Sequence, residues 1–292
     1  MTAPNRILVA GGGGRLGHAL QSIGATSLTR SEFDITDAHR ISSALEERRP
    51  DLVINAAAYT DVEGAETNRD TAFAINATGA GELAKACATA DIPLIHISTD
   101  YVFADGSPEE PVSEARPPNP LSCYGESKLA GELAVQAVGG THAIVRVSWL
   151  FDQGPDTFVG KMLNVAAERD EMKVVNEAFG RPTSVGDLAP KLKELAEMFL
   201  GGKTELPQIL HMGPPKPVSR FEWAEEIFRA SGTQGGPAPR LSPCSASEFP
   251  TKVRHPLGLV LDVTTADALL GPMADWQSAT AAAVKRQVLP TH

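Results

Sequence analysis

The chain has 292 residues, of which 42% are hydrophobic and 21% charged, a composition typical of a soluble globular protein with room for two lobes. A formal net charge of −10 without any basic block argues against nucleic acid as a partner. No apolar run approaches the ~20 residues of a membrane helix, and residues 1–6 show no signal peptide. Three separated cysteines indicate a reducing compartment, so we expect a cytoplasmic protein that does not bind membranes.

Residues 7–149 alternate short apolar segments with helix-like ones. Strands are expected at residues 7–10, 25–28, 52–55, 94–98 and 143–149, and helices at 16–23, 41–48, 71–90 and 122–138. Pro50 ends the second helix, and the run Pro117-Pro118-Asn119-Pro120 precedes the fourth. Because strands joined by helices make right-handed crossovers, the pattern predicts an α/β fold with a Rossmann-type doubly wound parallel sheet.

The pattern changes after Trp149. Helices are expected at residues 158–169, 187–199 and 221–230, a short strand at 173–175, and a loop at 232–239. We therefore predict a dinucleotide-binding domain over residues 1–150 and a smaller α/β lobe, mainly substrate-binding, over residues 151–292. Whether segments of the second lobe return to the first is left open.

A glycine-rich turn follows the first strand, in the segment ILVAGGGGRLGHAL. Glycine permits positive φ and a close approach of the backbone to a pyrophosphate, and the N-terminus of the next helix favours an anion. No GK[ST] follows, so a triphosphate-binding P-loop is not supported. The turn predicts a dinucleotide site that includes Gly11, Gly14, Arg15, Leu16 and Gly17.

The end of the second strand bears on which dinucleotide binds. Arg30 can pair with a 2′-phosphate there, which favours NADP. Asp34 lies 20 residues beyond Gly14, a spacing that keeps NAD open. We expect Arg30, Asp34 and Ile35 to contact the cofactor, with NADPH preferred and NADH as the alternative.

The segment HISTDYVFADG places polar side chains at the end of the fourth strand, where a doubly wound sheet binds its ligand. Thr99 is therefore expected to face a substrate. Tyr124 and Lys128 lie four residues apart, on one face of the following helix. A lysine ammonium near a phenol lowers the pKa of the phenol, so Tyr124 is predicted to exchange a proton with a carbonyl or alcohol oxygen that Thr99 holds.

The segments GGGGRLG, NAAAYTDVEGAE, NATG, STDYVF, YGESKLAGE and VRVSWLF resemble the extended short-chain dehydrogenase/reductases, and most closely the dTDP-4-dehydrorhamnose reductase family. The resemblance covers most of residues 6–185 and continues more weakly beyond them. It implies a catalytic triad of Thr99, Tyr124 and Lys128. It also implies cofactor contacts from Ala56, Ala57, Ala58, Tyr59, Ser98, Tyr124 and Lys128, and sugar contacts from Val62, Thr99, Asp100, Tyr101, Tyr124 and Trp149.

The activity that the resemblance implies is NAD(P)H-dependent reduction of the C4 keto group of a nucleotide-linked 4-keto-6-deoxy sugar, as in dTDP-rhamnose biosynthesis. Tyr124 would donate a proton to the developing alkoxide while hydride passes from the nicotinamide to C4. Arg181, Arg220 and Lys161 are candidates to bind the diphosphate, with a surface role as the alternative. A homodimer is left open.

Two other functions compete with this reading. One is a nucleotide-sugar epimerase or dehydratase, although Tyr101 rather than Glu after Asp100 argues against elimination. The other is a non-catalytic NADP-binding protein that resembles the regulatory subunit of methionine adenosyltransferase. Intact Thr99, Tyr124 and Lys128 favour an enzyme.

Some positions depart from the family pattern or suggest structural roles. Thr157, Asn176-Glu177, His255 and Leu259 stand where relatives usually have other residues, which leaves the sugar and nucleotide open. Ala19 and Gly186 stand where some relatives carry glutamates for Mg²⁺, and their side chains cannot ligate, so no metal is expected. Asn76 is expected to link a helix to a strand, and Arg146, within a buried strand, is a candidate to pair with a carboxylate.

Overall fold

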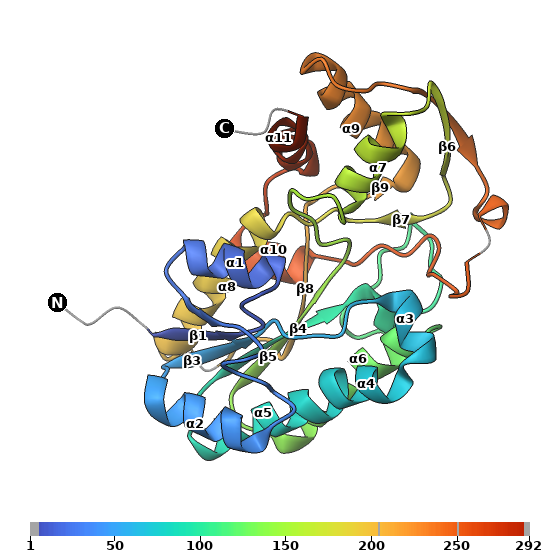
Figure 1. Ribbon diagram of the computed structural model, residues 1–292. Coiled ribbons are helices and arrows are strands. Elements are labelled where there is room, and N and C mark those ends of the chain that lie inside the picture. The colour runs from blue at the N-terminus through green and yellow to red at the C-terminus, as the bar shows by residue number, and fades with distance from the viewer. Residues whose placement is uncertain (1–5, 204, 250, 289–292) are drawn as a thin grey trace.

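A six-stranded parallel sheet runs through the centre of the computed structural model, which describes residues 6–203, 205–249 and 251–288 (Figure 1). In spatial order its strands are β2 (Thr26–Leu28), β1 (Ile7–Ala10), β3 (Leu52–Asn55), β4 (Leu94–Thr99), β5 (His142–Val147) and β8 (Ile209–Met212). Every residue of β1, β3, β4 and β5 is buried, as expected of parallel strands covered on both faces. The predicted α/β class and Rossmann-type sheet are confirmed.

Helices cover both faces of this sheet (Figure 1). One face carries α1 (Arg15–Ser22), α8 (Val185–Leu200) and α10 (Thr264–Leu270), and the other carries α2 (Ala38–Arg48), α5 (Ala80–Thr89) and α6 (Cys123–Val138). Because successive strand residues point to opposite faces, Ile54 of β3 packs with Leu188 on the first face, and its neighbour Val53 packs with Leu83 on the second. None of the helices in the described residues is long and apolar enough to span a membrane.

A continuous helical run over residues 69–89 contains a π-helical turn. It consists of α4 (Arg69–Phe73), the turn Ala74–Gly79 and α5, and the unpredicted short helix α3 (Val62–Thr67) precedes it. Asn76, buried in this turn, accepts a hydrogen bond from Tyr59 N at 2.8 Å and donates to Ser127 Oγ at 2.9 Å. Asn76 is thus structural, as expected, but it joins the loop after β3 to α6 rather than joining a helix to a strand.

The smaller lobe lies beyond the carboxyl ends of the central strands (Figure 1). It contains α7 (Phe158–Ala166), α9 (Arg220–Thr233), α11 (Trp276–Val288) and two small sheets: β6 (Glu171–Val175) with β10 (Arg240–Cys244), and β7 (Phe179–Gly180) with β9 (Val218–Ser219). Two 3₁₀ turns, Asp100–Val102 and Ala246–Glu248, complete the described elements. Trp223 of α9 is buried at the centre of this lobe and packs with Phe151 and Val284.

Three segments from beyond residue 150 return to the first sheet. β8 adds a sixth strand beside β5, and α8 and α10 pack in the cluster that covers one face of the sheet. The sequence left this return open, because four residues of β8 (ILHM) are too few to distinguish a strand from a buried loop. The division into domains at residue 150 stays a prediction.

A buried ion pair connects α6 to the centre of the sheet. Arg146 Nη2 and Nε on β5 lie 2.6 Å and 2.9 Å from the two carboxylate oxygens of Glu132, and the two side chains are 2% and 1% exposed. Ser98 Oγ on β4 donates to the same carboxylate at 2.5 Å. The pairing of Arg146 with a carboxylate is confirmed, and Ser98 is held at the end of β4.

We predict that Arg146→Met destabilises the protein by about 3–5 kcal/mol, because the Glu132 carboxylate remains buried without its partner. Urea unfolding followed by circular dichroism measures this change. The double variant Arg146→Met/Glu132→Leu serves as the control, since it removes both charges and should recover most of the lost stability. Equal losses in the single and double variants would contradict the assignment.

Candidate functional site

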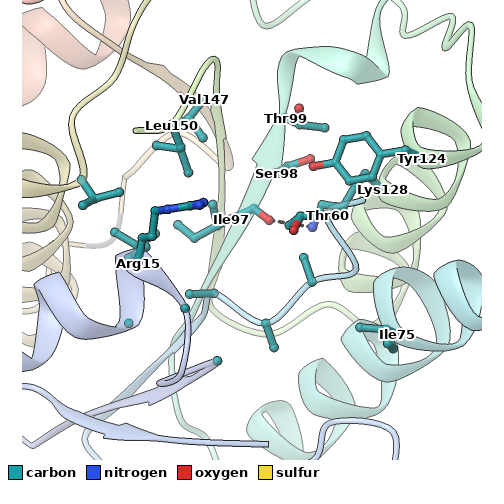
Figure 2. Close-up of a pocket in the computed structure, with 18 of the residues that line it drawn as sticks. Arg15, Thr60, Ile75, Ile97, Ser98, Thr99, Tyr124, Lys128, Val147 and Leu150 are labelled. Carbon is teal, nitrogen blue, oxygen red and sulfur yellow. Dashed lines mark hydrogen bonds between the residues drawn. The ribbon is translucent and has the colours of Figure 1, made fainter. Parts of the chain in front are cut away.

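A cavity of about 610 Å³ opens at the carboxyl edge of the central sheet, where β1, β3, β4 and β5 end. Figure 2 shows Ser98, Thr99 and Tyr124 on one side of it and Arg15 on the other. The predicted residues that line it are Gly11, Gly14, Arg15, Leu16, Gly17, Arg30, Asp34, Ile35, Ala56, Ala57, Ala58, Val62, Ser98, Thr99, Asp100, Tyr101, Tyr124, Lys128 and Trp149. Tyr59 is not among the lining residues.

Some lining residues were not predicted. They are Gly13, Phe33, Thr60, Ile75, Ile97, Val147, Leu150 and Val185. Ile97 and Val147 occupy the ends of buried strands, and Val185 begins α8, so in the sequence they look like ordinary core residues. Thr60 had a usable signal, because it follows the small residues Ala56–Ala58 at the end of β3.

The glycine turn packs too tightly for a side chain at Gly11 and at Gly17. Gly11 has φ +90°, and a Cβ there would lie 2.6 Å from Ala57 N. A Cβ on Gly17 would lie 2.4 Å from Gly11 O. Gly14 caps α1 without a side-chain hydrogen bond, and the first turn of α1 has no acidic residue. The N–H groups at this helix end therefore suit an anion such as a pyrophosphate.

Arg30 and Asp34 form an ion pair beside the cavity. Arg30 Nε lies 3.1 Å from Asp34 Oδ2, and the Arg30 side chain is 71% exposed. Burial acts to raise the pKa of Asp34, but hydrogen bonds from Thr36 and Arg30 outweigh it and hold this pKa below its ordinary value. The exposed guanidinium can reach a ligand at the cavity rim while Asp34 stays ionised.

Thr99 and Tyr124 face the same cavity on the side opposite Arg15 (Figure 2). Thr99 Oγ1 accepts from Tyr101 N at 3.2 Å and donates to Asp100 Oδ1 at 3.0 Å, which orients the hydroxyl. The Asp100 carboxyl is buried, and burial raises its pKa to about 6, partly offset by Thr99 and Arg220.

The expected low pKa of Tyr124 is wrong for this structure. Burial raises the pKa of Tyr124, Asp100 and Tyr101 raise it further, and the Thr99 side chain acts against them. Lys128 Nζ donates to Ile97 O at 2.8 Å and lies 3.4 Å from His96 Nε2. Among the described residues no hydrogen bond joins Lys128 to Tyr124. This explains why the Lys128 side chain does not stabilise the phenolate form of Tyr124. Burial in turn lowers the pKa of Lys128 to about 8.

Near Asp100 and Tyr101 the lining of the cavity is aromatic and cationic. Trp149 has φ +49°, rare for a bulky residue, and its ring stacks on Trp223 with the centroids 5.7 Å apart. Arg220, at the start of α9, places its guanidinium carbon 3.6 Å from the centre of the Trp149 ring. Burial lowers the pKa of Arg220 to about 10, which leaves it charged. This part of the cavity suits a polar, anionic ligand.

Two of the three predicted diphosphate candidates lie away from this cavity. Arg181 is buried, and it donates to Leu261 O at 2.7 Å and to Pro214 O at 2.6 Å. Lys161, on the exposed side of α7, does not line the cavity. Only Arg220 does. In the part of the chain that the structure describes, no cluster of three His, Cys, Asp or Glu side chains forms a candidate metal site.

Comparison with known proteins extends over the whole chain. A family model described as "RmlD substrate binding domain" matches residues 5–289. The dTDP-4-dehydrorhamnose reductase of Mycobacterium tuberculosis is 39% identical over 96% of this chain and 92% of its own length. A protein of Streptomyces niveus named dTDP-4-keto-6-deoxy-D-glucose reductase is 31% identical over 94% of the chain and 95% of its own length.

Solved structures agree with these sequence matches. The dTDP-4-dehydrorhamnose reductase of Bacillus anthracis in complex with NADP superimposes with a TM-score of 0.86 and 31% identity, over 99% of this chain and 100% of that one. The UDP-glucose 4-epimerase of Thermus thermophilus in complex with NAD has a TM-score of 0.77 at 21% identity, covering 98% and 100% of the two chains. The latter likeness shows a shared fold alone.

We predict that Gly17→Ala weakens dinucleotide binding by about tenfold or more, because the new methyl group would force the glycine turn to move. Isothermal titration calorimetry with NADP measures this loss. Gly13→Ala, in the same turn, is the matched control, since a Cβ there meets no protein atom within 4 Å and should cost less. The same affinity for Gly17→Ala as for the unmodified protein would refute the steric argument.

Proposed function

Because this chain belongs to the RmlD substrate binding domain family, together with dTDP-4-dehydrorhamnose reductases, we propose that it reduces the C4 keto group of a nucleotide-linked 4-keto-6-deoxy sugar. The chain is an NAD(P)H-dependent oxidoreductase that acts on a nucleotide sugar. Relatives named for dTDP-4-dehydrorhamnose and for dTDP-4-keto-6-deoxy-D-glucose share the keto-deoxysugar class and differ in the sugar. Our proposal is therefore made for the class.

One observation carries this proposal: Thr99, Tyr124 and Lys128 line the same cavity as the glycine turn. A reduction needs a hydride donor and a proton donor at one carbonyl group. The glycine turn and the free N-terminus of α1 suit the pyrophosphate of a dinucleotide. The strand end and α6 bring a phenol and a hydroxyl to the same cavity.

NADPH fits the part of the cavity from the glycine turn to Lys128, and it supplies the hydride when bound. In our proposal Gly11, Gly14 and Gly17 with the N-terminus of α1 hold the pyrophosphate. Arg30 binds the 2′-phosphate, because its long side chain places an exposed cation at the rim of the cavity. Lys128 binds the nicotinamide ribose. The small side chains Ala56–Ala58 leave room for the rest of the cofactor.

The proton transfer follows from the state of Tyr124. Its raised pKa keeps the phenol protonated at neutral pH, which is the state that a proton donor requires. Thr99 orients the substrate oxygen by a second hydrogen bond, and Tyr124 protonates that oxygen as negative charge develops on it. Water from the solvent returns the proton to Tyr124 after the product leaves.

The sugar and its diphosphate would occupy the end of the cavity formed by Tyr101, Trp149 and Arg220. Arg220 is the one of the three predicted diphosphate candidates that lines the cavity, and its position over Trp149 suits a flat, partly anionic ligand. Asp100, followed by Tyr101, offers no second carboxylate for elimination, so reduction is favoured over a dehydratase reaction.

The purified protein, mixed with NADPH and a dTDP-4-keto-6-deoxyhexose, should consume NADPH in proportion to the sugar added. Absorbance of the reduced nicotinamide measures the reaction. An epimerase or dehydratase would regenerate its cofactor, so turnover of the sugar without net NADPH loss would refute the reductase proposal. Tight NADPH binding without turnover of any such sugar would instead support a non-catalytic binding protein.

We expect Tyr124→Phe to lower kcat by about 10²–10⁴, the usual contribution of a general acid, because the proton donor is lost. Calorimetry should show nearly unchanged NADPH affinity, since the ring remains. Tyr59→Phe is the matched control, because Tyr59 does not line the cavity and should keep full activity. Undiminished turnover by Tyr124→Phe would remove Tyr124 from the mechanism.

Arg30→Ala should raise KM for NADPH roughly tenfold to hundredfold and leave KM for NADH almost unchanged, because a charge-assisted hydrogen bond to the 2′-phosphate is worth about 1.5–3 kcal/mol. Steady-state kinetics with each cofactor measure the two values. Arg229→Ala removes another exposed arginine, which pairs with Glu226 and does not line the cavity, and should affect neither. Equal effects on both cofactors would argue against phosphate recognition.

A further inference from the structure

A buried histidine lies behind the reaction centre and has no part in the mechanism above. His96, in the middle of β4, has no exposed surface. Its Nδ1 lies 3.1 Å from Asn55 Nδ2 at the end of β3, and its Nε2 lies 3.4 Å from Lys128 Nζ. The imidazole thus bridges a side chain beside the cofactor loop and the lysine of the predicted triad.

The direction of these hydrogen bonds can be worked out from one backbone group. Ala57 N–H can only donate, and it points to Asn55 Oδ1 at 3.1 Å. The amide of Asn55 is therefore oriented with its oxygen toward Ala57 and its NH₂ group toward His96. Because Asn55 Nδ2 is a donor, His96 Nδ1 must accept. A neutral imidazole that accepts at Nδ1 carries its single proton on Nε2.

The proton on His96 Nε2 then faces Lys128 Nζ. An ammonium group has three donors and no acceptor, so it cannot accept this proton, whereas a neutral amine has one lone pair that can. The neutral amine satisfies every contact observed: it accepts from His96, donates to Ile97 O at 2.8 Å, and retains one N–H for a ligand in the cavity. The charged form would place two donors against each other.

We propose that Asn55 and His96 form a hydrogen-bond relay that favours the neutral amine form of Lys128 over its ammonium form. His96 is in this view a positioning residue, which acts through Lys128 and does not touch the substrate. The proposal deepens the ketoreductase function and rests on it for its purpose, although the protonation state can be measured without substrate.

The surroundings of Lys128 agree with the proposal. Burial disfavours the ammonium and lowers the pKa of Lys128, and burial also lowers the pKa of His96 far below its ordinary value, which keeps the imidazole neutral. On its own helix Lys128 faces Glu132, which favours the charged form, but the Glu132 carboxylate is already paired with Arg146. Tyr124 lies one turn earlier on the same helix, and its phenol is neutral because burial raises its pKa. His142, on β5, lies near His96.

The relay has a consequence for the reaction. A lower pKa of Lys128 weakens the attraction of negative charge to the Tyr124 oxygen, which favours the phenol that still carries the proton consumed by ketone reduction. An enzyme that oxidises an alcohol needs the opposite state, a phenolate beside an ammonium. The pair Asn55 and His96 therefore favours the protonated phenol, which is the state that reduction uses.

Nuclear magnetic resonance of the full-length, cofactor-free protein tests the relay. Long-range ¹H–¹⁵N correlations report which His96 nitrogen carries the proton, and the shift of ¹³Cε-labelled Lys128 reports its protonation between pH 6 and 11. We expect the Nε2–H form of His96 and a Lys128 titration midpoint at or below about 8. His96→Met should raise the midpoint by about one pH unit, a tenfold change in the neutral fraction.

Asn55→Asp provides a second route that leaves His96 in place. A carboxylate accepts from His96 Nδ1–H, so His96 Nε2 becomes an acceptor and the ammonium form of Lys128 should be favoured. His142→Gln is the matched control, because it removes another buried histidine that contacts Gly140 O rather than Lys128, and should leave the midpoint in place.

Either of two results would overturn the relay: a Nδ1–H form of His96, or a Lys128 midpoint that does not move in His96→Met. The rate of sugar reduction is measured separately, so the two proposals can fail independently. A correct tautomer and midpoint in a protein that turns over no ketosugar would leave the relay standing and refute the reductase.

Discussion

Parallel pairing of β1, β3, β4 and β5 brings four segments of chain out of the sheet at one edge, and every property of the site depends on this constraint. In the order β2-β1-β3-β4-β5, β2 lies on one side of β1 and the later strands lie on the other, so the switch point of the sheet is between β1 and β3. A doubly wound sheet leaves a crevice at this point. The glycine turn after β1 lies so close to Ala56 and Ala57 after β3 that Gly11 tolerates no side chain, and Gly17 tolerates none because it packs against Gly11 and Gly12. Thr99 at the end of β4 and Trp149 after β5 complete the cavity.

Burial determines the chemistry of the groups at this edge. Tyr124 and Lys128 are largely buried where they line the cavity, so the charged form of each is disfavoured, and the phenol stays protonated. The Glu132–Arg146 pair anchors α6 to β5 and at the same time orients Ser98, one residue before Thr99. Structural groups and the groups that we propose as catalytic are thus neighbours on the same two strands and one helix.

In our proposal the smaller lobe contributes to the part of the cavity that binds the sugar. Arg220 and Trp149 come from different parts of the chain and meet because α9 packs on the loop after β5. His255 lies with Nδ1 2.9 Å from the Tyr101 hydroxyl. In our proposal Tyr101 borders the sugar, so this contact bears on which sugar the cavity accepts.

The sequence by itself determined the sheet of the first 147 residues, the glycine turn and the positions of Thr99, Tyr124 and Lys128, because short apolar strands, glycine spacing and a four-residue helical spacing are local patterns. It also implied most of the lining residues through family resemblance. Only the tertiary structure decided that β8 returns to the sheet and that the pKa of Tyr124 is raised. It also decided that Arg181 donates hydrogen bonds to two carbonyl oxygens, while Arg220 lines the cavity. These properties depend on burial and on contacts between residues far apart in the chain, such as His96 with Lys128. A local sequence pattern does not determine how deeply a side chain is buried, and burial shifts its pKa.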